Sequence, residues 1–163
     1  MTVALAFFAL LVAGAQTKEN RVTLQPLAIH ANCGGSTRCV FDGEDLVIQI
    51  AIVNHGPKPI GFPLVYQQTR GPSIRLVDMR TKANSILRTN PVDPALENEF
   101  TQIGPSESAT LAWVIKTSEI QQFGKTEIDL SAEISLGCKI EVNGRLEDFQ
   151  GWDTLRIVEK PSP

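Results

Sequence analysis

The sequence predicts an all-β protein whose single domain is a β-sandwich or a barrel. Apolar and polar residues alternate with a period of two through most of the chain after Lys18, which is the pattern of half-buried strands. Turns rich in glycine and proline separate these segments, and only one stretch has a helical pattern. Eight or nine short strands spaced in this way are typical of sandwiches and barrels.

The first strands are predicted at residues 22–25 and 27–29, where apolar residues occupy alternate positions. Residues 46–53 are apolar on nearly both faces, which indicates a central strand that is covered on both sides. Turn residues end this strand, and the next is predicted at residues 60–66. Two prolines, one before this segment and one inside it, place it at a sheet edge because proline cannot donate to the ladder.

The series continues at residues 74–78, followed by a turn at 81–84. Residues 89–99 contain two prolines, each preceded by Asn or Asp, and are predicted to form a long surface loop. Further strands are predicted at residues 100–103 and 111–115, with a Gly-Pro-Ser turn between them.

The last third of the chain contains the one helical segment and the clearest strand. Residues 117–122 begin with capping side chains and stop before a glycine, so they are predicted to form a short helix. Residues 128–136 alternate cleanly between apolar and polar. The Asn-Gly pair at 143–144 predicts a tight hairpin, and residues 152–158 form the closing strand.

The N-terminal segment has the features of an export signal. Residues 3–14 are almost all apolar, and the sequence Ala-Gly-Ala at 13–15 fits the small-x-small pattern that signal peptidases cut. About a dozen apolar residues are too few to span a bilayer core of ~30 Å. We therefore expect a signal peptide over residues 1–15 and a secreted or periplasmic domain over 16–163, with an ordered core at about 20–159 and no membrane insertion after cleavage.

The charge pattern narrows the class of partner. The net charge is −3, and acidic and basic residues are mixed along the chain without a basic block. Nucleic acids and anionic membranes are therefore not the expected partners. An unidentified protein partner is expected instead.

Three cysteines lie in a chain that is expected to reach an oxidising compartment, where disulfides form. Cys33 and Cys39 flank a flexible five-residue loop that can bring their sulfur atoms together, so this pair is the favoured disulfide. Cys138 is then free. The alternative pairs Cys138 with one of the other two, which closes a longer loop and would stabilise more, by roughly 4–5 kcal/mol against about 2–3.

Two turn motifs carry a resemblance to a known class of modules. Residues 43–46 lead into a long strand that ends in Asn-His-Gly-Pro at 54–57, and a Gly-Pro-Ser-Glu-Ser turn at 104–108 precedes the next inward-facing strand. Over residues 43–115 this order resembles Ig-like modules of the bacterial intracellular proteinase inhibitor type, and the sandwich domains that accompany some secreted metalloproteases. The resemblance implies an Ig-like antiparallel β-sandwich. Its motifs are turns, so no inhibitory residue is transferred, and the export signal argues against an intracellular role.

The sequence contains no recognisable catalytic or metal-binding motif. It has two histidines, His30 and His55, and no nucleophile elbow of the G-x-S-x-G type. His30, Cys33 and Cys39 lack the ligand spacing of zinc sites. The acidic residues at 42–45 lack the pattern of a calcium-binding EF-hand loop and are interpreted as a charged turn. No enzyme activity, metal or cofactor is therefore expected.

Aromatic and loop residues are the remaining candidates for function. Trp113 and Trp152 are predicted to be core anchors. A possible interaction surface is expected to include Phe62, Tyr66, Pro91, Pro94 and Glu97. The predicted function is an exported, non-enzymatic binding module, in its specific form a protease inhibitor that acts through the 89–99 loop. A structural subunit of an envelope or extracellular assembly, and an enzyme with an unrecognised site, are the alternatives.

Overall fold

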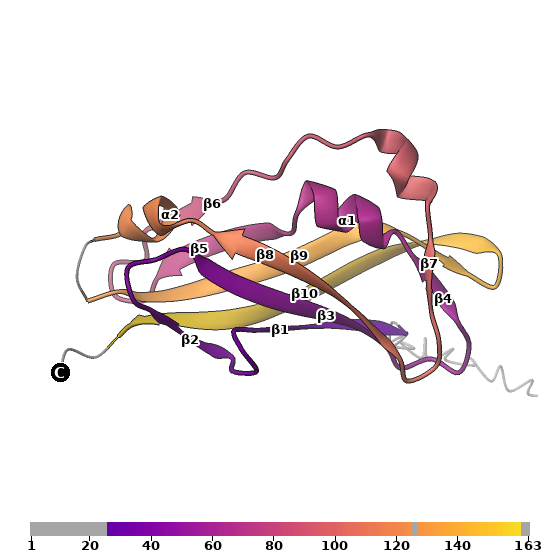
Figure 1. Ribbon diagram of the computed structural model, residues 1–163, viewed down its shortest axis with the longest axis horizontal. Coiled ribbons are helices and arrows are strands. Elements are labelled where there is room, and N and C mark those ends of the chain that lie inside the picture. The colour runs from indigo at the N-terminus through magenta and orange to yellow at the C-terminus, as the bar shows by residue number, and fades with distance from the viewer. Residues whose placement is uncertain (1–25, 125–126, 161–163) are drawn as a thin grey trace, which may run out of the picture.

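A computed structural model describes residues 26–124 and 127–160 of the chain. Within these ranges it contains ten strands, two short α-helices and one 3-10 helix (Figure 1), so the prediction of a mostly β fold is confirmed. The expected signal peptide at 1–15 and the expected strand at 22–25 lie outside the described residues. In the described ranges, no helix combines the length and hydropathy that a membrane span requires.

The strands form two sheets. The three-stranded sheet has the order β1–β3–β8 and is antiparallel throughout; it contains β1 (Leu27–Asn32), β3 (Leu46–Asn54) and β8 (Ser108–Ile115). The seven-stranded sheet is built around the long antiparallel hairpin of β9 (Asp129–Val142) and β10 (Arg145–Glu159).

The other strands of the larger sheet flank this hairpin on both sides. On the outer edge of β10, β2 (Arg38–Phe41) pairs in parallel, so the predicted antiparallel arrangement has one exception. The other edge of β9 is shared by two hairpin-like pairs. One pair consists of β5 (Ser73–Asp78) and β6 (Asn84–Ile86), and the other of β4 (Ile60–Phe62) and β7 (Thr101–Ile103).

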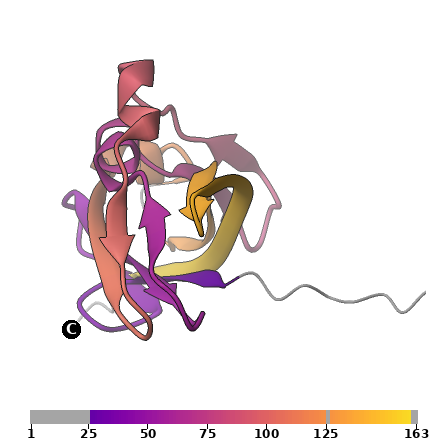
Figure 2. The ribbon, with the colours of Figure 1, turned by 90° about the vertical axis from the view of Figure 1, so that its right-hand side faces the viewer.

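The two sheets share one hydrophobic core, which the strands surround when the molecule is viewed end-on (Figure 2). Alternate residues of each long strand point into it, as expected for the pleat of a β-strand. The predicted inward face of β9 is confirmed. The fully buried side chains include Ile48, Ile50, Ile52, Ile74, Leu76, Leu111, Ile115, Leu130, Ala132, Leu136, Leu155 and Ile157.

The turn between β9 and β10 is the tight hairpin that the sequence predicts. Asn143 and Gly144 both have positive φ, 53° and 72°, which a two-residue type I′ turn requires. This turn fixes the register of the whole hairpin, because it sets Val142 opposite Arg145. Every later pair follows from that first one, including Ser135 opposite Trp152.

The predicted strand at 60–66 is wrong in its second half. β4 ends at Phe62, and the chain continues as helix α1 (Leu64–Arg70) directly after Pro63. The inward-facing residues of this segment are three positions apart and not two, since Leu64 and the fully buried Gln67 lie on the inner side of the helix. Proline fixes its own φ near the helical value and is well tolerated at a helix start. The helix packs against β8, which belongs to the other sheet.

The prediction that Trp152 anchors the core is also wrong. Trp152 is 78% exposed. Leu155 and Ile157 point inward, and because neighbouring residues of a strand face opposite sides, Trp152 points outward with Thr154. Trp113, by contrast, is half-buried and packs against the core.

The structure contains ten strands where eight or nine were expected, and two short ones were not foreseen. β2 and β6 have four and three residues, too few to show a clear alternation. The predicted helix at 117–122 is confirmed as α2 (Thr117–Gln121). The predicted loop at 89–99 contains a 3-10 helix, η1 (Pro94–Asn98).

Candidate functional site

The predicted interaction residues separate into one buried residue and four that lie on the surface. Phe62 is fully buried and meets Phe149 edge-to-face, with ring centroids 6.1 Å apart. The prediction that Phe62 belongs to an interaction surface is therefore wrong. Phe62 is buried because its side chain is part of the core that the two sheets share. The others are Tyr66, which is half-buried on α1, and the exposed Pro91, Pro94 and Glu97.

The segment that carries these exposed residues is held firmly against α1. The backbone N–H of Asn90 donates to the carbonyl oxygen of Arg70 at 2.8 Å, and its side-chain amide donates to the carbonyl oxygen of Thr69 at 3.1 Å. These bonds satisfy carbonyl groups at the end of the helix, which lack partners within it. Asp93 caps η1 by accepting from the N–H of Ala95 at 2.9 Å. The backbone of the segment is therefore attached to the end of α1 at Asn90 and capped at Asp93.

A pocket of about 530 Å³ opens between α1, η1 and the β9–β10 hairpin. It lies where the edge of β9 that faces away from β10 has no strand neighbour, because β5 pairs with β9 only up to Ser135 and β4 pairs only from Glu141. Gln67 bridges this gap from α1, since its side-chain Nε2 donates to the carbonyl oxygen of Gly137 at 3.1 Å. The lining residues are Pro63, Tyr66, Glu97, Gly137, Cys138, Lys139, Asp148, Phe149 and Gln150. We call this the α1–η1 pocket.

Two polar pairs border the α1–η1 pocket. The neighbouring Glu97 carboxylate raises the pKa of Tyr66 above its ordinary value, and partial burial adds to the shift. On the opposite side, Lys139 and Asp148 form an exposed ion pair across the hairpin at 2.6 Å. The pocket thus combines a neutral phenol with charges of both signs, which suits hydrogen bonding to a polar partner.

The sequence reasoning missed the hairpin side of this pocket, although a signal for it was present. The Asn-Gly turn fixes the register, so Lys139 must lie opposite Asp148 and Cys138 opposite Phe149. Opposite charges in directly facing positions are a recognised cross-strand pair. No sequence signal places α1 or η1 over that hairpin, because this contact depends on the tertiary fold.

Cys138 is a free thiol that is half-buried in the α1–η1 pocket. Burial raises its pKa to about 12, while the nearby Gln67 amide partly opposes the shift. The thiolate is the reactive form of cysteine. Cys138 is therefore held in the form that does not react as a nucleophile.

Cys138 in the folded protein should react with iodoacetamide at least about a hundredfold more slowly at pH 8 than in the unfolded chain. A pKa of about 12 leaves on the order of one thiolate in 10⁴ molecules at that pH, against roughly a quarter for an unperturbed cysteine. Mass spectrometry of carbamidomethylation over time, with and without urea, measures both rates. Equal rates would contradict the assigned burial of the thiol.

The favoured disulfide is present. Cys33 and Cys39 are bonded, with Cα atoms 5.4 Å apart. Cys33 directly follows β1 of the smaller sheet and Cys39 lies in β2 of the larger one, so the bond joins the chain where it crosses between the sheets. The disulfide does not line the α1–η1 pocket, and its role is structural.

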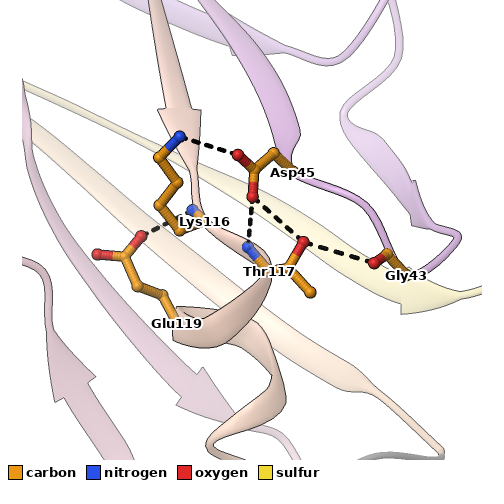
Figure 3. A network of polar contacts seen from close by, with 5 residues as sticks. All are labelled: Gly43, Asp45, Lys116, Thr117 and Glu119. Atoms are coloured by element: carbon orange, nitrogen blue, oxygen red, sulfur yellow. Dashed lines mark hydrogen bonds and ion pairs between the residues drawn. The ribbon is translucent and has the colours of Figure 1, made fainter.

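The acidic segment at 42–45 also has a structural role (Figure 3). The Asp45 carboxylate pairs with Lys116 at 2.8 Å and accepts from the backbone N–H of Thr117, also at 2.8 Å. The Thr117 hydroxyl reaches Gly43, and Glu119 accepts from the N–H of Lys116. The hydrogen bond from Lys116 is the main reason that the pKa of Asp45 is lowered. Together these contacts join the β2–β3 turn to the start of α2.

The histidines do not form a catalytic arrangement. His30 and His55 are both exposed, and their rings meet edge-on with centroids 6.4 Å apart. Among residues 26–124 and 127–160, no group of three or more His, Cys, Asp or Glu side chains is placed to hold a metal ion.

Comparisons with known proteins do not assign the chain to a family. No family model matches the sequence, and no curated protein matches it. Among solved structures, the chain is similar to the Northeast Structural Genomics Consortium target SoR45, with a TM-score of 0.44, 11% identity and coverage of 82% of this chain and 87% of that one. It is also similar to a protein from Archaeoglobus fulgidus, with a TM-score of 0.37, 12% identity and coverage of 85% and 98%. A β-glucosidase from Listeria innocua matches with a TM-score of 0.31, 10% identity and coverage of 81% and 16%. These likenesses assign neither a family nor a function.

Proposed function

We propose that the protein is an exported, non-enzymatic binding module of Ig-like type that holds a partner protein at the surface around the α1–η1 pocket. The observation that carries this proposal is the fixed presentation of the 89–99 segment. Its backbone is anchored without a partner, because Asn90 is bonded to the end of α1 and Asp93 caps η1. Ordering a loop in advance removes an entropy cost from binding, and loops on a rigid scaffold are common binding elements.

Two further features support a binding role outside the cytoplasm. The Cys33–Cys39 disulfide is compatible with an oxidising compartment. Glu97 lies beside Tyr66 and above the pocket, and tyrosine is enriched in protein interfaces because it combines a large ring with a hydrogen-bonding group.

Three short edge strands favour this proposal over assembly by strand addition at those strands. The edge strands β2, β6 and β7 of the larger sheet have only three or four residues, and short edges are poor templates for pairing. In the smaller sheet, the edge strand β8 contacts α1, and the other edge strand, β1, has six residues and contacts β10. At these edges a partner is expected to use side chains of the loop and helix rather than a backbone ladder; on the outer side of β10, strand pairing is present only from Arg156 to Glu159.

A comparative capture experiment tests the proposal. The mature protein, Glu97→Lys and Glu44→Lys serve as baits for the exported proteome, and each captured protein is then purified and titrated. Both substitutions make the same charge change at exposed positions, but only Glu97 borders the pocket. We expect a partner that binds the unchanged protein and Glu44→Lys equally and binds Glu97→Lys at least about tenfold more weakly, a loss of about 1.4 kcal/mol. Equal binding to all three would overturn the proposed site.

The protease-inhibitor version has its own test. Purified protein is assayed against a panel of secreted serine, cysteine and metalloproteases, with cleavage of the 89–99 segment monitored by mass spectrometry. Inhibition by the unchanged protein that is lost on exchange of residues 91–94 for glycine and serine would support it. Binding of a partner without inhibition of any protease would reject this version and retain the broader one.

A further inference from the structure

Trp152 and Ile86 are the two most exposed large apolar side chains in the described part of the chain, at 78% and 68%. Neither is used by the core or by the α1–η1 pocket. Both line a second pocket, of about 430 Å³, on the outer face of the seven-stranded sheet. Exposed apolar side chains that line one pocket together with polar groups can contact a ligand there.

The strand registers place this second pocket across four neighbouring strands, β10, β9, β5 and β6 (Figure 1). One row across the sheet joins Trp152, Ser135 and Ser73. The next row joins Thr154, Glu133, Arg75 and Ile86. With strands about 4.8 Å apart, the β10 and β6 ends of the pocket are separated by about 14 Å. We call this set of residues the Trp152 trough.

The trough has apolar ends and a polar floor. Ser73 and Ser135 lie between the tall side chains of Trp152 and Ile86, and their hydroxyl groups can each donate and accept. Glu133 and Arg75 form an ion pair at 2.6 Å, and each side chain is about half exposed, at 44% and 50%. Both Arg75 contacts go to Oε2 of Glu133. No described donor bonds to the other carboxylate oxygen, so it is open to a ligand hydroxyl.

The two charges on the floor of the trough cancel, and the third charged residue of the pocket, Asp153, is engaged at its border, which limits the class of ligand. Arg75 neutralises Glu133. The Asp153 carboxylate is turned toward β1, where it accepts from the backbone N–H of Ala31 at 2.7 Å. An anionic or cationic ligand would therefore gain little electrostatic attraction from the trough.

Neutral sugars match this arrangement. A pyranose ring has an apolar C–H face that can lie on the indole ring, and hydroxyl groups at its edge that can bond to serine, glutamate and arginine together. The span between the two apolar ends exceeds one pyranose ring. The side chains rise from paired strands, so they are already positioned before binding. We infer that the Trp152 trough binds a neutral oligosaccharide, with one sugar ring stacked on Trp152 and its hydroxyl groups bonded to the Ser135, Glu133 and Arg75 side chains.

Titration with defined oligosaccharides tests this inference. The probes are neutral β-1,4- and α-1,4-linked glucose, xylose and N-acetylglucosamine oligomers of two to six units, with heparin oligomers as charged comparators. Trp113→Phe leaves Trp152 as the single tryptophan of the chain, so its fluorescence reports on the trough alone. We expect a saturable fluorescence change with at least one neutral series, confirmed by calorimetry, with an affinity that is unchanged between low and high salt.

Three substitutions decide the role of the trough. Trp152→Ala should lower the affinity at least about tenfold, Trp152→Phe should retain most of it, and Leu146→Ala, which removes another exposed apolar side chain on the same strand, should have no effect. Trp152 is exposed, so the unfolding midpoint of its variants should match that of the unchanged protein. Binding that survives Trp152→Ala, binding of heparin alone, or no binding to any neutral series at millimolar concentration would each overturn the inference. A protein partner that depends on Trp152 while no sugar binds would also overturn it.

The trough can be tested separately from the α1–η1 pocket. Glu97 does not line the trough, so Glu97→Lys should bind the same oligosaccharide with unchanged affinity. Loss of partner binding in Glu97→Lys with retained sugar binding would support two independent surfaces.

Discussion

Replacing Gly71 by alanine should lower the free energy of unfolding by about 2–6 kcal/mol. Gly71 ends α1 with φ 83° and ψ 161°, a backbone conformation that is essentially restricted to glycine and costs other residues about 1–3 kcal/mol. A Cβ atom at this position would also overlap the ring of Trp113. Trp113 packs against the core, so relieving the overlap requires a displacement there, which adds about 1–3 kcal/mol.

The matched control is Gly144→Ala in the β9–β10 turn. Gly144 also has a positive φ, 72°, but no heavy atom lies within 4 Å of the Cβ that alanine would add. Its cost should be limited to backbone strain, about 1–2 kcal/mol. Urea unfolding followed by circular dichroism measures both. Equal losses of unfolding free energy in Gly71→Ala and Gly144→Ala would show that overlap with Trp113 adds nothing to the cost of the first substitution.

Phe62→Ala should cost about 3–5 kcal/mol, because it removes a fully buried aromatic side chain and leaves a cavity. Phe62→Leu keeps much of the apolar contact and should cost less. A double-mutant cycle with Phe149→Leu should give a coupling of about 0.5–1.5 kcal/mol, as expected for an edge-to-face aromatic pair.

The same variant distinguishes a core role from an interaction role. Phe62→Leu in its folded form should bind the partner captured by the unchanged protein with the same affinity, since Phe62 has no exposed surface. If fully folded Phe62→Leu did not bind the partner, the prediction that Phe62 belongs to the interaction surface would be supported.

The strands that could be predicted from the sequence are those with one apolar face and one polar face. Residues 128–136 alternate between apolar and polar, and this follows directly from one buried and one solvated face of β9. The Asn-Gly turn and the Cys33–Cys39 bond were also predictable, because both depend on residues close together in the chain. Helix α1 was missed because residues 60–66 are apolar at most positions, and a short apolar run fits a strand or a helix equally well.

The candidate sites were harder to predict, because both are made by contacts between distant segments. Tyr66 and Glu97 were expected on one surface and do lie together, yet the third side of their pocket comes from β9 and β10. Trp152 was assigned to the core on residue type alone. Counting along β10 from the Asn-Gly turn would have placed it opposite Ser135, on a face where most of its neighbours are polar.

The β9–β10 hairpin has a consequence for the order in which the domain folds. Its strands have 14 and 15 residues and are joined by only two, so their pairing begins with very little loss of chain entropy. All other sheet contacts of β9 and β10 join segments that are far apart in sequence, and such contacts form slowly. The hairpin is thus the natural starting point for folding, onto which the smaller sheet and α1 assemble later. Substitutions at its turn should mainly slow folding, whereas those in the short edge strands β2 and β6 should mainly speed unfolding.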